Sequence, residues 1–335
     1  MKKYVNLFVF VFMIGACLSQ GRAQTKSAVS YKNPVVDIAM PDPTVIKAAD
    51  GYFYVYATES TRNVPIMKSK DLVEWTYCNT AFTNKTRPRF EPKAGIWAPD
   101  INYINGKYVL YYAMSVWGGE QTCGIGVATA NSPQGPFTDH GKMFRSNEIG
   151  VQNSIDPSLL QYEGRNYLVW GSFRGIYVIE LTADGLSIMP GAKKKRIAGT
   201  AFEAVYIHKY GDYYYMLASI GSCCQGVKST YKVVVGRSKK VWGPYKDKTG
   251  KPMLKNGYSL VIGANDHFVG NGHGSQIIRD DAGQDWLLYH GFLRSTPENG
   301  RILLLDQIKW DQEGWPYVEG GSPSYETQKA PVFNN

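Results

Sequence analysis

Residues 156–172, with the sequence DPSLLQYEGRNYLVWGS, contain a pattern that the rest of the chain repeats. The stretch begins with a polar residue, continues as an apolar strand pattern, turns at a glycine and ends in a second, aromatic strand. Four other stretches have the same order of features, and their leading residues are Asp42, Asp100, Glu203 and His273. Together with Asp156, these residues mark five copies of one two-strand unit.

The spacing of the five leading residues indicates the fold. They recur at intervals of roughly 50 to 70 residues, an irregular period close to that of propeller blades. In a propeller the innermost strand of every blade lines a central channel, so equivalent residues meet around one axis. The pattern predicts an all-β, five-bladed β-propeller with four carboxylates and one imidazole in its channel.

Each leading residue has a simpler interpretation, because aspartates often satisfy backbone amides in turns and at strand ends. For the set of five this interpretation is less attractive, since like charges gathered in one cleft repel one another. We therefore interpret the ring as a functional site.

The N-terminal residues 1–23 have the features of a secretory signal. Two lysines precede an apolar run over residues 5–16, which is shorter than the roughly 20 residues needed to span a bilayer. Cys17 ends the sequence IGAC, which is typical of a lipoprotein signal, whereas cleavage after Ala23 would release a soluble protein. We favour the lipoprotein interpretation and expect a bacterial protein that is periplasmic or lipid-anchored at the outer membrane.

Composition fits one large exported domain, for which we expect the bounds 33–320. Strand formers are abundant, with 24 Tyr and 8 Trp, and 35 Gly can supply turns. The formal charge is +9, and a basic run at residues 193–196 falls on an expected blade turn. We interpret this run as a solvated loop, and we expect a monomer with no nucleic-acid partner and no membrane contact beyond a lipid at Cys17.

Four cysteines lie beyond the signal, at positions 78, 123, 223 and 224. Four cysteines allow three pairings, among which the sequence does not choose. No CxxC pair is present, which argues against a structural zinc site. The adjacent pair at 223 and 224 is unusual, and its redox state stays open.

Local sequence suggests how the ring residues are held. A proline follows both Asp42 and Asp156, and it would stiffen the backbone beside each carboxylate. Trp97 lies three residues before Asp100, where its ring could face the channel mouth and stack on a sugar, although a core tryptophan is an equally good interpretation.

Converging carboxylates can perform a narrow set of reactions. An ionised aspartate can activate a water molecule, and a glutamic acid whose pKa is raised by a neighbouring charge can protonate a leaving oxygen. A third carboxylate can supply that charge. This division of labour is the one needed to hydrolyse a glycosidic bond with inversion.

The motifs around the ring resemble those of a known family, glycoside hydrolase family 43, whose members are five-bladed β-propellers. The resemblance covers residues 33–317. A second motif, GSCCQG at residues 221–226 followed by STYKVVVGRS at 229–238, resembles the arabinan-degrading branch, the endo-1,5-α-L-arabinanases. The family motifs are Met40-Pro-Asp-Pro-Thr-Val, Trp97-Ala-Pro-Asp, Ser154-Ile-Asp-Pro-Ser, Glu203-Ala-Val-Tyr-Ile and Gly272-His-Gly.

The resemblance implies roles for individual residues. Asp42 would be the general base, Glu203 the general acid, and Asp156 the group that orients the acid and raises its pKa. His273 would help to hold a calcium or similar ion in the channel, largely through water. One departure is that Ala204 and Val205 follow the acid, where the family often has a proline; this leaves the linkage preference open.

The resemblance also implies a sugar cleft lined by Trp97 and Phe173, with which we group Asp100 as a substrate-binding residue. We expect a secreted, inverting hydrolase of α-1,5-linked L-arabinan with endo action. The alternatives are an exo-acting α-L-arabinofuranosidase or a β-xylosidase of the same family. A carbohydrate-binding propeller without catalysis, or a purely structural one, would leave the three carboxylates unexplained.

Overall fold

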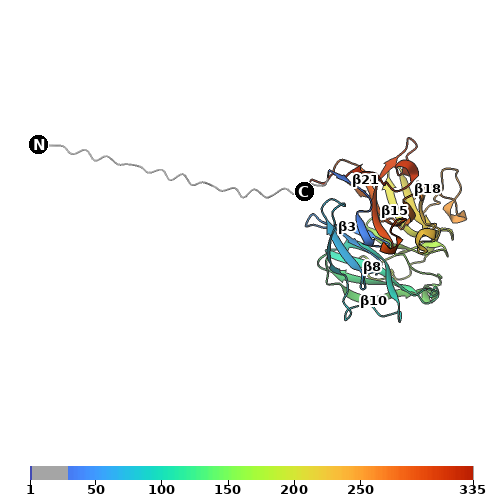
Figure 1. Ribbon diagram of the computed structural model, residues 1–335. Helices are drawn as coiled ribbons and strands as arrows, with labels where there is room; N and C mark the ends of the chain where they lie inside the picture. The colour runs from blue at the N-terminus through green and yellow to red at the C-terminus, as the bar shows by residue number, and fades with distance from the viewer. Residues whose placement is uncertain (2–28, 335) are drawn as a thin grey trace.

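Five antiparallel sheets surround a central channel in the protein (Figure 1). The structure is a computed structural model that describes residue 1 and residues 29–334. The prediction of a five-bladed, all-β propeller is confirmed. The expected signal at residues 1–23, with Cys17, lies outside the described residues.

Each of the first four blades consists of four strands that follow one another along the chain. The first blade contains β3 (Thr44–Lys47), β4 (Phe53–Tyr56), β5 (Pro65–Ser69) and β6 (Thr76–Thr80). The second contains β7 (Gly95–Ile104), β8 (Lys107–Ser115), β9 (Gly124–Ala130) and β10 (Thr138–Arg145). The third contains β11 (Ser158–Tyr162), β12 (Arg165–Trp170), β13 (Ile176–Glu180) and β14 (Lys195–Ala198). The fourth contains β15 (Glu203–Tyr210), β16 (Tyr213–Ile220), β17 (Lys232–Ser238) and β18 (Ser259–Ile262).

The fifth blade closes the ring with a strand from the other end of the chain. Its main path is β19 (Phe268–Gly272), β21 (Asp285–Leu293), β22 (Ile302–Trp310) and the N-terminal β2 (Val36–Ala39). Short strands β20 (Ile278–Arg279) and β23 (Pro316–Tyr317) pair with β21 and β22. Because β2 supplies the outermost strand, the first and last parts of the domain are hydrogen-bonded together, and in Figure 1 the blue and red segments lie side by side.

The domain is wider than the predicted bounds of 33–320. Strand β1 (Ser30–Tyr31) pairs with β24 (Gln328–Lys329), and Phe333 is packed in the same buried cluster as Tyr31. The predicted boundaries therefore cut off two segments that belong to the fold. The helical segments are short: α1 (Ser146–Ile149), η1 (Gly226–Lys228), η2 (Met253–Lys255), η3 (Pro297–Asn299) and η4 (Glu319–Gly321).

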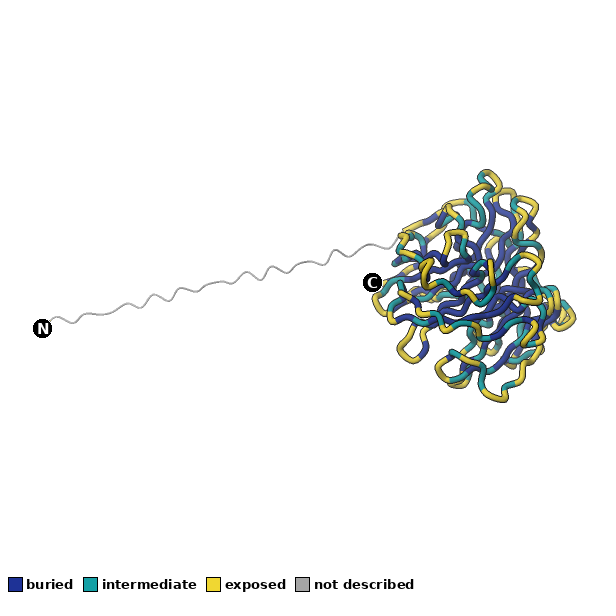
Figure 2. The backbone as a smooth tube through the Cα atoms, turned by 90° about the horizontal axis from the view of Figure 1, so that it is seen from below, coloured by how far each residue is buried: buried dark blue, intermediate teal, exposed yellow. Residues whose placement is uncertain are grey.

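The hydrophobic core lies between neighbouring blades. One large cluster of buried side chains joins each neighbouring pair, including the first and fifth blades. Complete burial of one large apolar side chain contributes roughly 1.5–3 kcal/mol. Figure 2 shows the buried segments in the middle of the molecule and the exposed segments mainly at the outer turns. Packing between blades thus holds the channel walls in place.

Two of the open questions about cysteine are answered by the described residues. Cys223 and Cys224 form a disulfide with each other, and Cys78 and Cys123 are free. No helix in the described part of the chain is both long and apolar enough to cross a membrane.

Candidate active site

One backbone feature recurs where the innermost segment of every blade passes the channel. In each blade a residue with positive φ lies at this place, and in the first and third blades it is the aspartate before a proline. A proline also follows the equivalent residue of the second blade, Ala98. The five residues are Asp42 (φ 55°), Ala98 (φ 41°), Asp156 (φ 56°), Ala204 (φ 54°) and His273 (φ 50°).

This register corrects the predicted place of Asp100. Asp100 follows Ala98 by two positions, which places it about 6–7 Å farther along the strand. It is 1% exposed, lies outside the cavity lining, and accepts hydrogen bonds from the Tyr206 hydroxyl and the Leu159 amide, both at 2.7 Å. The prediction that Asp100 binds substrate is therefore wrong: it joins the second blade to the third and fourth.

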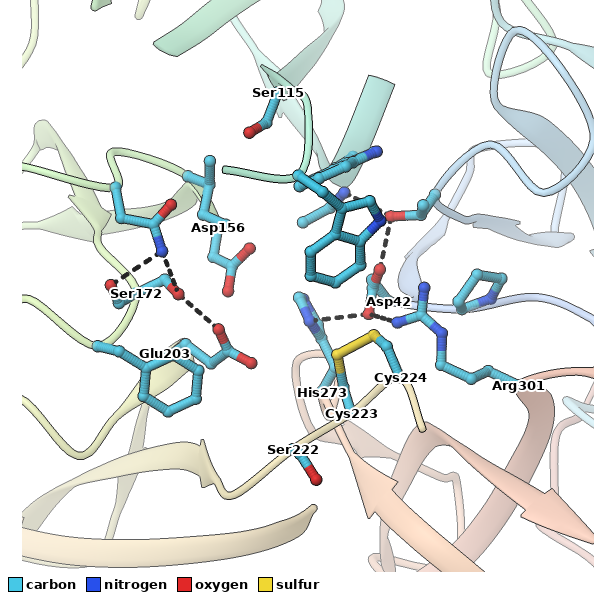
Figure 3. A pocket seen from close by; sticks show the side chains of 18 of the residues that line it. Asp42, Ser115, Asp156, Ser172, Glu203, Ser222, Cys223, Cys224, His273 and Arg301 are labelled. Carbon is cyan, nitrogen blue, oxygen red and sulfur yellow. Dashed lines mark hydrogen bonds and ion pairs between the residues drawn. A yellow bond between two sulfur atoms is a disulfide. The ribbon is translucent and has the colours of Figure 1, made fainter. Parts of the chain in front are cut away.

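The other ring residues meet in one cavity of about 780 Å³. Asp42, Asp156, Glu203 and His273 all line it. Figure 3 shows Asp156 and Glu203 on one side and Asp42 on the other. The volume falls in the usual range for small-molecule sites. The rest of the lining comes largely from the loops that join the second and third strands of each blade.

Asp42 is surrounded by hydrogen-bond donors and cationic groups. Its Oδ1 lies 2.7 Å from Arg301 Nη1 and 3.2 Å from His273 Nδ1, and Thr58 donates a hydrogen bond of 2.6 Å to Oδ2. Burial by itself would raise the pKa of Asp42, but the Arg301 and His273 charges hold that pKa well below its ordinary value. Asp42 is therefore ionised near neutral pH.

Two histidines contact Asp42, and their pKa values are shifted in opposite directions. Burial alone would lower the pKa of His273, but the Asp42 carboxylate raises it above the ordinary value. Burial, followed by the charge of Arg301, lowers the pKa of His290 well below the ordinary value. His290 Nδ1 accepts a hydrogen bond of 3.0 Å from the Asp42 amide. Neutral His290 therefore anchors the Asp42 backbone, while His273 faces the carboxylate.

The opposite wall contains two carboxyl groups on which His273 also acts as a positive charge, but for which the described residues include no arginine ion pair. Ion pairs of the described residues include Asp42 but neither Asp156 nor Glu203. Ser172 donates a hydrogen bond of 2.6 Å to Glu203 Oε2, and Asp156 Oδ2 accepts one of 3.1 Å from the Ala204 amide.

Burial dominates the protonation of this pair. Burial and the charge of Glu203 raise the pKa of Asp156 to about 8. Burial also raises the pKa of Glu203, although hydrogen bonds from Ser172 and Tyr231 partly offset it. Because the two carboxyls are coupled, they share the retained proton as a pair near neutral pH.

Aromatic side chains line the cavity where the sequence predicted them, and one was missed. Trp97 and Phe173 are both in the lining, as is Trp117. Trp97 and Trp117 have ring centroids 5.4 Å apart, and Trp117 is 78% exposed. Trp117 could have been found, because its loop follows the second strand of its blade as the loop with Phe173 does.

A second set of polar residues includes four that form hydrogen bonds with the ring residues or their backbone. They occupy equivalent places close to the end of each blade's second strand, and the sequence signal for them is a hydroxyl after Ala, Gly or Met in four of the five copies. Ser219, for example, accepts a hydrogen bond of 2.8 Å from the His273 amide. The set is Thr58, Ser115, Ser172, Ser219 and His290. Arg301 was also missed, since it lies in a loop without a recognisable motif.

The predicted ion has limited support from the donor atoms. In the described part of the chain, no three His, Cys, Asp or Glu side chains are placed to hold a metal together. His273 directs Nδ1 toward Asp42, at 3.2 Å. These residues do not fit an ion with a full set of protein ligands, and they fit only one held largely through water, with His273 as its contact.

Comparison with known proteins places the chain in a family. A model of glycosyl hydrolases family 43 matches residues 31–316. The chain belongs to this family. It is therefore a glycoside hydrolase, and the sequence-based assignment is confirmed.

Several relatives are similar over most of their length. Extracellular endo-alpha-(1->5)-L-arabinanase 1 of Bacillus subtilis is 37% identical over 290 residues, which are 82% of this chain and 86% of the relative. Extracellular exo-alpha-(1->5)-L-arabinofuranosidase ArbA of Cellvibrio japonicus is 36% identical over 307 residues, which are 83% of this chain and 86% of the relative. A Cellvibrio cellulosa alpha-L-arabinanase complexed with arabinohexaose superposes with a TM-score of 0.77 at 33% identity, covering 85% of this chain and 96% of that structure.

Proposed function

We propose that the protein hydrolyses α-1,5-linked L-arabinan within the chain and with inversion of the anomeric centre. The observation that carries the proposal is the contrast across one cavity between ionised Asp42 and the proton-retaining pair of Asp156 and Glu203. Inverting hydrolysis needs one carboxylate and one carboxylic acid on opposite sides of the scissile bond. The names of the similar arabinanases support the substrate.

The chain's own groups suffice for both proton transfers. Asp42 accepts a proton from the attacking water, while Glu203 donates a proton to the departing glycosidic oxygen. Arg301 keeps Asp42 ionised, although it also weakens Asp42 as a base, because a lower pKa means lower basicity. Burial and the mutual repulsion of Asp156 and Glu203 favour retention of one proton by the pair.

The cavity walls suit a furanose chain. Trp97, Trp117 and Phe173 offer aromatic surface to the C–H faces of sugar rings, and the polar ring residues lie between them. Exo action is the alternative mode, and its support is the similarity to a relative that is named as exo-acting. A β-xylosidase of the same family is the alternative in substrate.

Product analysis on linear α-1,5-arabinan separates these modes. We expect an early spread of arabino-oligosaccharides from the wild type, and at least about 100-fold slower release of products from Glu203→Gln at equal protein concentration. Release of a single short product from the chain end would establish exo action. Activity on xylan substrates with none on arabinan would overturn the proposed substrate.

We propose in addition that a calcium or similar ion occupies the channel, held largely through water with His273 as its protein contact. The support is the acidic lining of the cavity, because Asp42, Asp156 and Glu203 line it together with His273, which would have to be neutral to contact the ion. Metal analysis of the purified protein, with the melting temperature before and after chelation, tests it. A protein that holds no stoichiometric metal would contradict the proposal.

We also propose that the protein is exported and, more specifically, that it lies in the periplasm or is anchored at the outer membrane. The support is the sequence of residues 1–23 and the extracellular relatives. Cell fractionation of wild type beside Cys17→Ala tests the lipid anchor. We expect the wild type in the membrane fraction and the variant in the soluble periplasmic fraction.

A further inference from the structure

The disulfide between Cys223 and Cys224 lies in the catalytic cavity. Both cysteines line the cavity that contains Asp42 and Glu203. Figure 3 shows the sulfur atoms among the side chains of that cavity. Neither proton-transfer step requires a disulfide, so its place here is unexplained by the catalytic groups.

The loop that carries the disulfide is tied at its base. The Ser222 carbonyl accepts hydrogen bonds from the Thr230 amide at 3.0 Å and the Tyr231 amide at 3.1 Å. The Gln225 amide donates one of 3.0 Å to the Ser229 hydroxyl. These contacts hold the loop between β16 and β17 in one shape, and the linked cysteines lie between them.

The disulfide is accessible from the cavity. Cys223 is half-buried and Cys224 is exposed. A disulfide has no charge and no N–H or O–H donor, and its sulfur atoms are polarisable and pack well against apolar groups. No aromatic side chain of the fourth blade is among the described lining residues, whereas the second and third blades provide Trp97, Trp117 and Phe173.

We propose that the Cys223–Cys224 disulfide is a substrate-binding surface that packs against the C–H face of an arabinofuranosyl unit. The proposal rests on the arabinan function proposed above. Sugar rings have polar edges and apolar faces, so a ring held by aromatic surface on one wall needs a neutral, apolar partner on another. The disulfide supplies this partner in the fourth blade.

A second role for the loop must be separated from binding. Tyr231, which closes the loop, also hydrogen-bonds Glu203 and packs on His290 with ring centroids 5.6 Å apart. Disruption of the loop could therefore change the general acid. Loss of a contact surface weakens substrate affinity, whereas a change in Glu203 alters kcat and the basic limb of the pH profile.

The test measures binding in a background that does not hydrolyse. Affinity of Glu203→Gln for arabinohexaose is measured by calorimetry with the disulfide intact, after reduction, and with Cys223→Ser and Cys224→Ser together. Reduction by a phosphine breaks the S–S bond and gives two thiols; the phosphine supplies two electrons and becomes its oxide, and water supplies the oxygen and the two protons. The matched control is Cys78→Ser, which removes a free thiol outside the cavity.

We expect both forms without the disulfide to bind about tenfold more weakly, consistent with the roughly 10- to 200-fold that one apolar contact contributes in a pocket. The control should bind as before, and melting temperatures should show that all variants are folded. Unchanged affinity in both forms would overturn the proposal. So would a loss of kcat with unchanged KM in the otherwise wild-type enzyme, because the disulfide would then act through Tyr231.

Failure of the proposed function has a different signature. If neither the intact Glu203→Gln protein nor the wild type binds arabinohexaose, the substrate assignment is wrong and the disulfide proposal falls with it. If the intact protein binds arabinohexaose and the forms without the disulfide bind it equally well, the proposed function stands and the disulfide proposal alone is overturned.

Discussion

The two walls of the cavity contain equally buried carboxyl groups in opposite states. Asp42 and Glu203 are each 8% exposed, and Asp156 is 7% exposed. Burial raises the pKa of a carboxyl group in every case, so burial cannot distinguish them. Arg301 and His273 reverse its effect at Asp42, while no arginine or lysine among the described residues forms an ion pair with Asp156 or Glu203. The partners of a buried carboxyl group, more than its depth, decide whether it can serve as base or acid.

The largest effect is expected when the carboxyl group of Asp42 or of Glu203 is replaced by an amide. We expect Asp42→Asn and Glu203→Gln each to lower kcat on linear arabinan by roughly 100- to 10,000-fold, the usual contribution of a general acid or base. Steady-state rates with matched melting temperatures provide the measurement. Rates within tenfold of the wild type in either variant would contradict the assigned roles.

An aryl arabinobioside with a good leaving group then distinguishes the role of Glu203 from that of Asp42. Because such a leaving group needs little protonation, Glu203→Gln should recover much of its rate on this substrate, and Asp42→Asn should not. Recovery in Asp42→Asn alone would show that the acid and the base have been exchanged, and equal recovery in both variants would contradict the separate roles.

Removal of the Arg301 charge should raise the pKa of Asp42 and make it more like Asp156 and Glu203 across the cavity. In Arg301→Met the pKa of Asp42 rises, so the acidic limb of the kcat/KM profile should move upward by about 1–3 pH units. Activity is then lost at acidic pH, where the wild type still has an ionised base. Arg165→Met, which removes an exposed arginine paired with Glu180, serves as the control. An acidic limb that stays in place in Arg301→Met would contradict the electrostatic account.

The two supporting hydroxyls allow a finer comparison. Thr58 donates to Asp42 and Ser172 donates to Glu203, both at 2.6 Å. Each hydrogen bond favours the ionised carboxylate, so Thr58→Val and Ser172→Ala should both raise a pKa. We expect the acidic limb to rise in Thr58→Val and the basic limb to rise in Ser172→Ala, each by about 1 pH unit or less. Movement of the same limb in both variants would contradict the separate roles.

The smallest expected effect concerns stability. The pKa of Asp156 is raised to about 8 in the folded protein, so the folded state holds more protons than the unfolded chain between the ordinary value and about 8. Stability from this group is therefore present at low pH and is lost as pH rises through that range. Asp156→Asn should melt at least about 2 °C above the wild type at pH 8, with less difference at pH 5. A lower melting temperature for the variant at pH 8 would contradict this prediction.

The repeat register shows where sequence interpretation succeeded and where it failed. Aligning the copies on their acidic residues found Asp42, Asp156 and Glu203, which the structure brings into one cavity. The same alignment was two positions off at Asp100, because the equivalent residue of the second blade is Ala98, and one position off at Glu203, which precedes Ala204. The proline after Ala98 was the available signal, and a charged side chain nearby was the more conspicuous one.

The sequence repeat did not predict the residues that contact the cavity carboxyl groups. Arg301 and Asp42 are separated by 259 positions and meet only because β2 closes the ring against β22. The contact between Ser172 and Glu203 likewise joins neighbouring blades. No local pattern encodes the distance between two loops on different sheets.

Local chemistry along the chain thus determined the strand pattern, the number of blades and the residue types that face the channel, since a period of two and a recurring turn are properties of neighbouring residues. Tertiary structure decided which carboxyl group is ionised, which retains a proton, and that Cys223 and Cys224 lie in the cavity. The reason is physical, because pKa values and cavity walls depend on burial and on charges a few ångströms away, and the ring closure brings these together from distant parts of the chain.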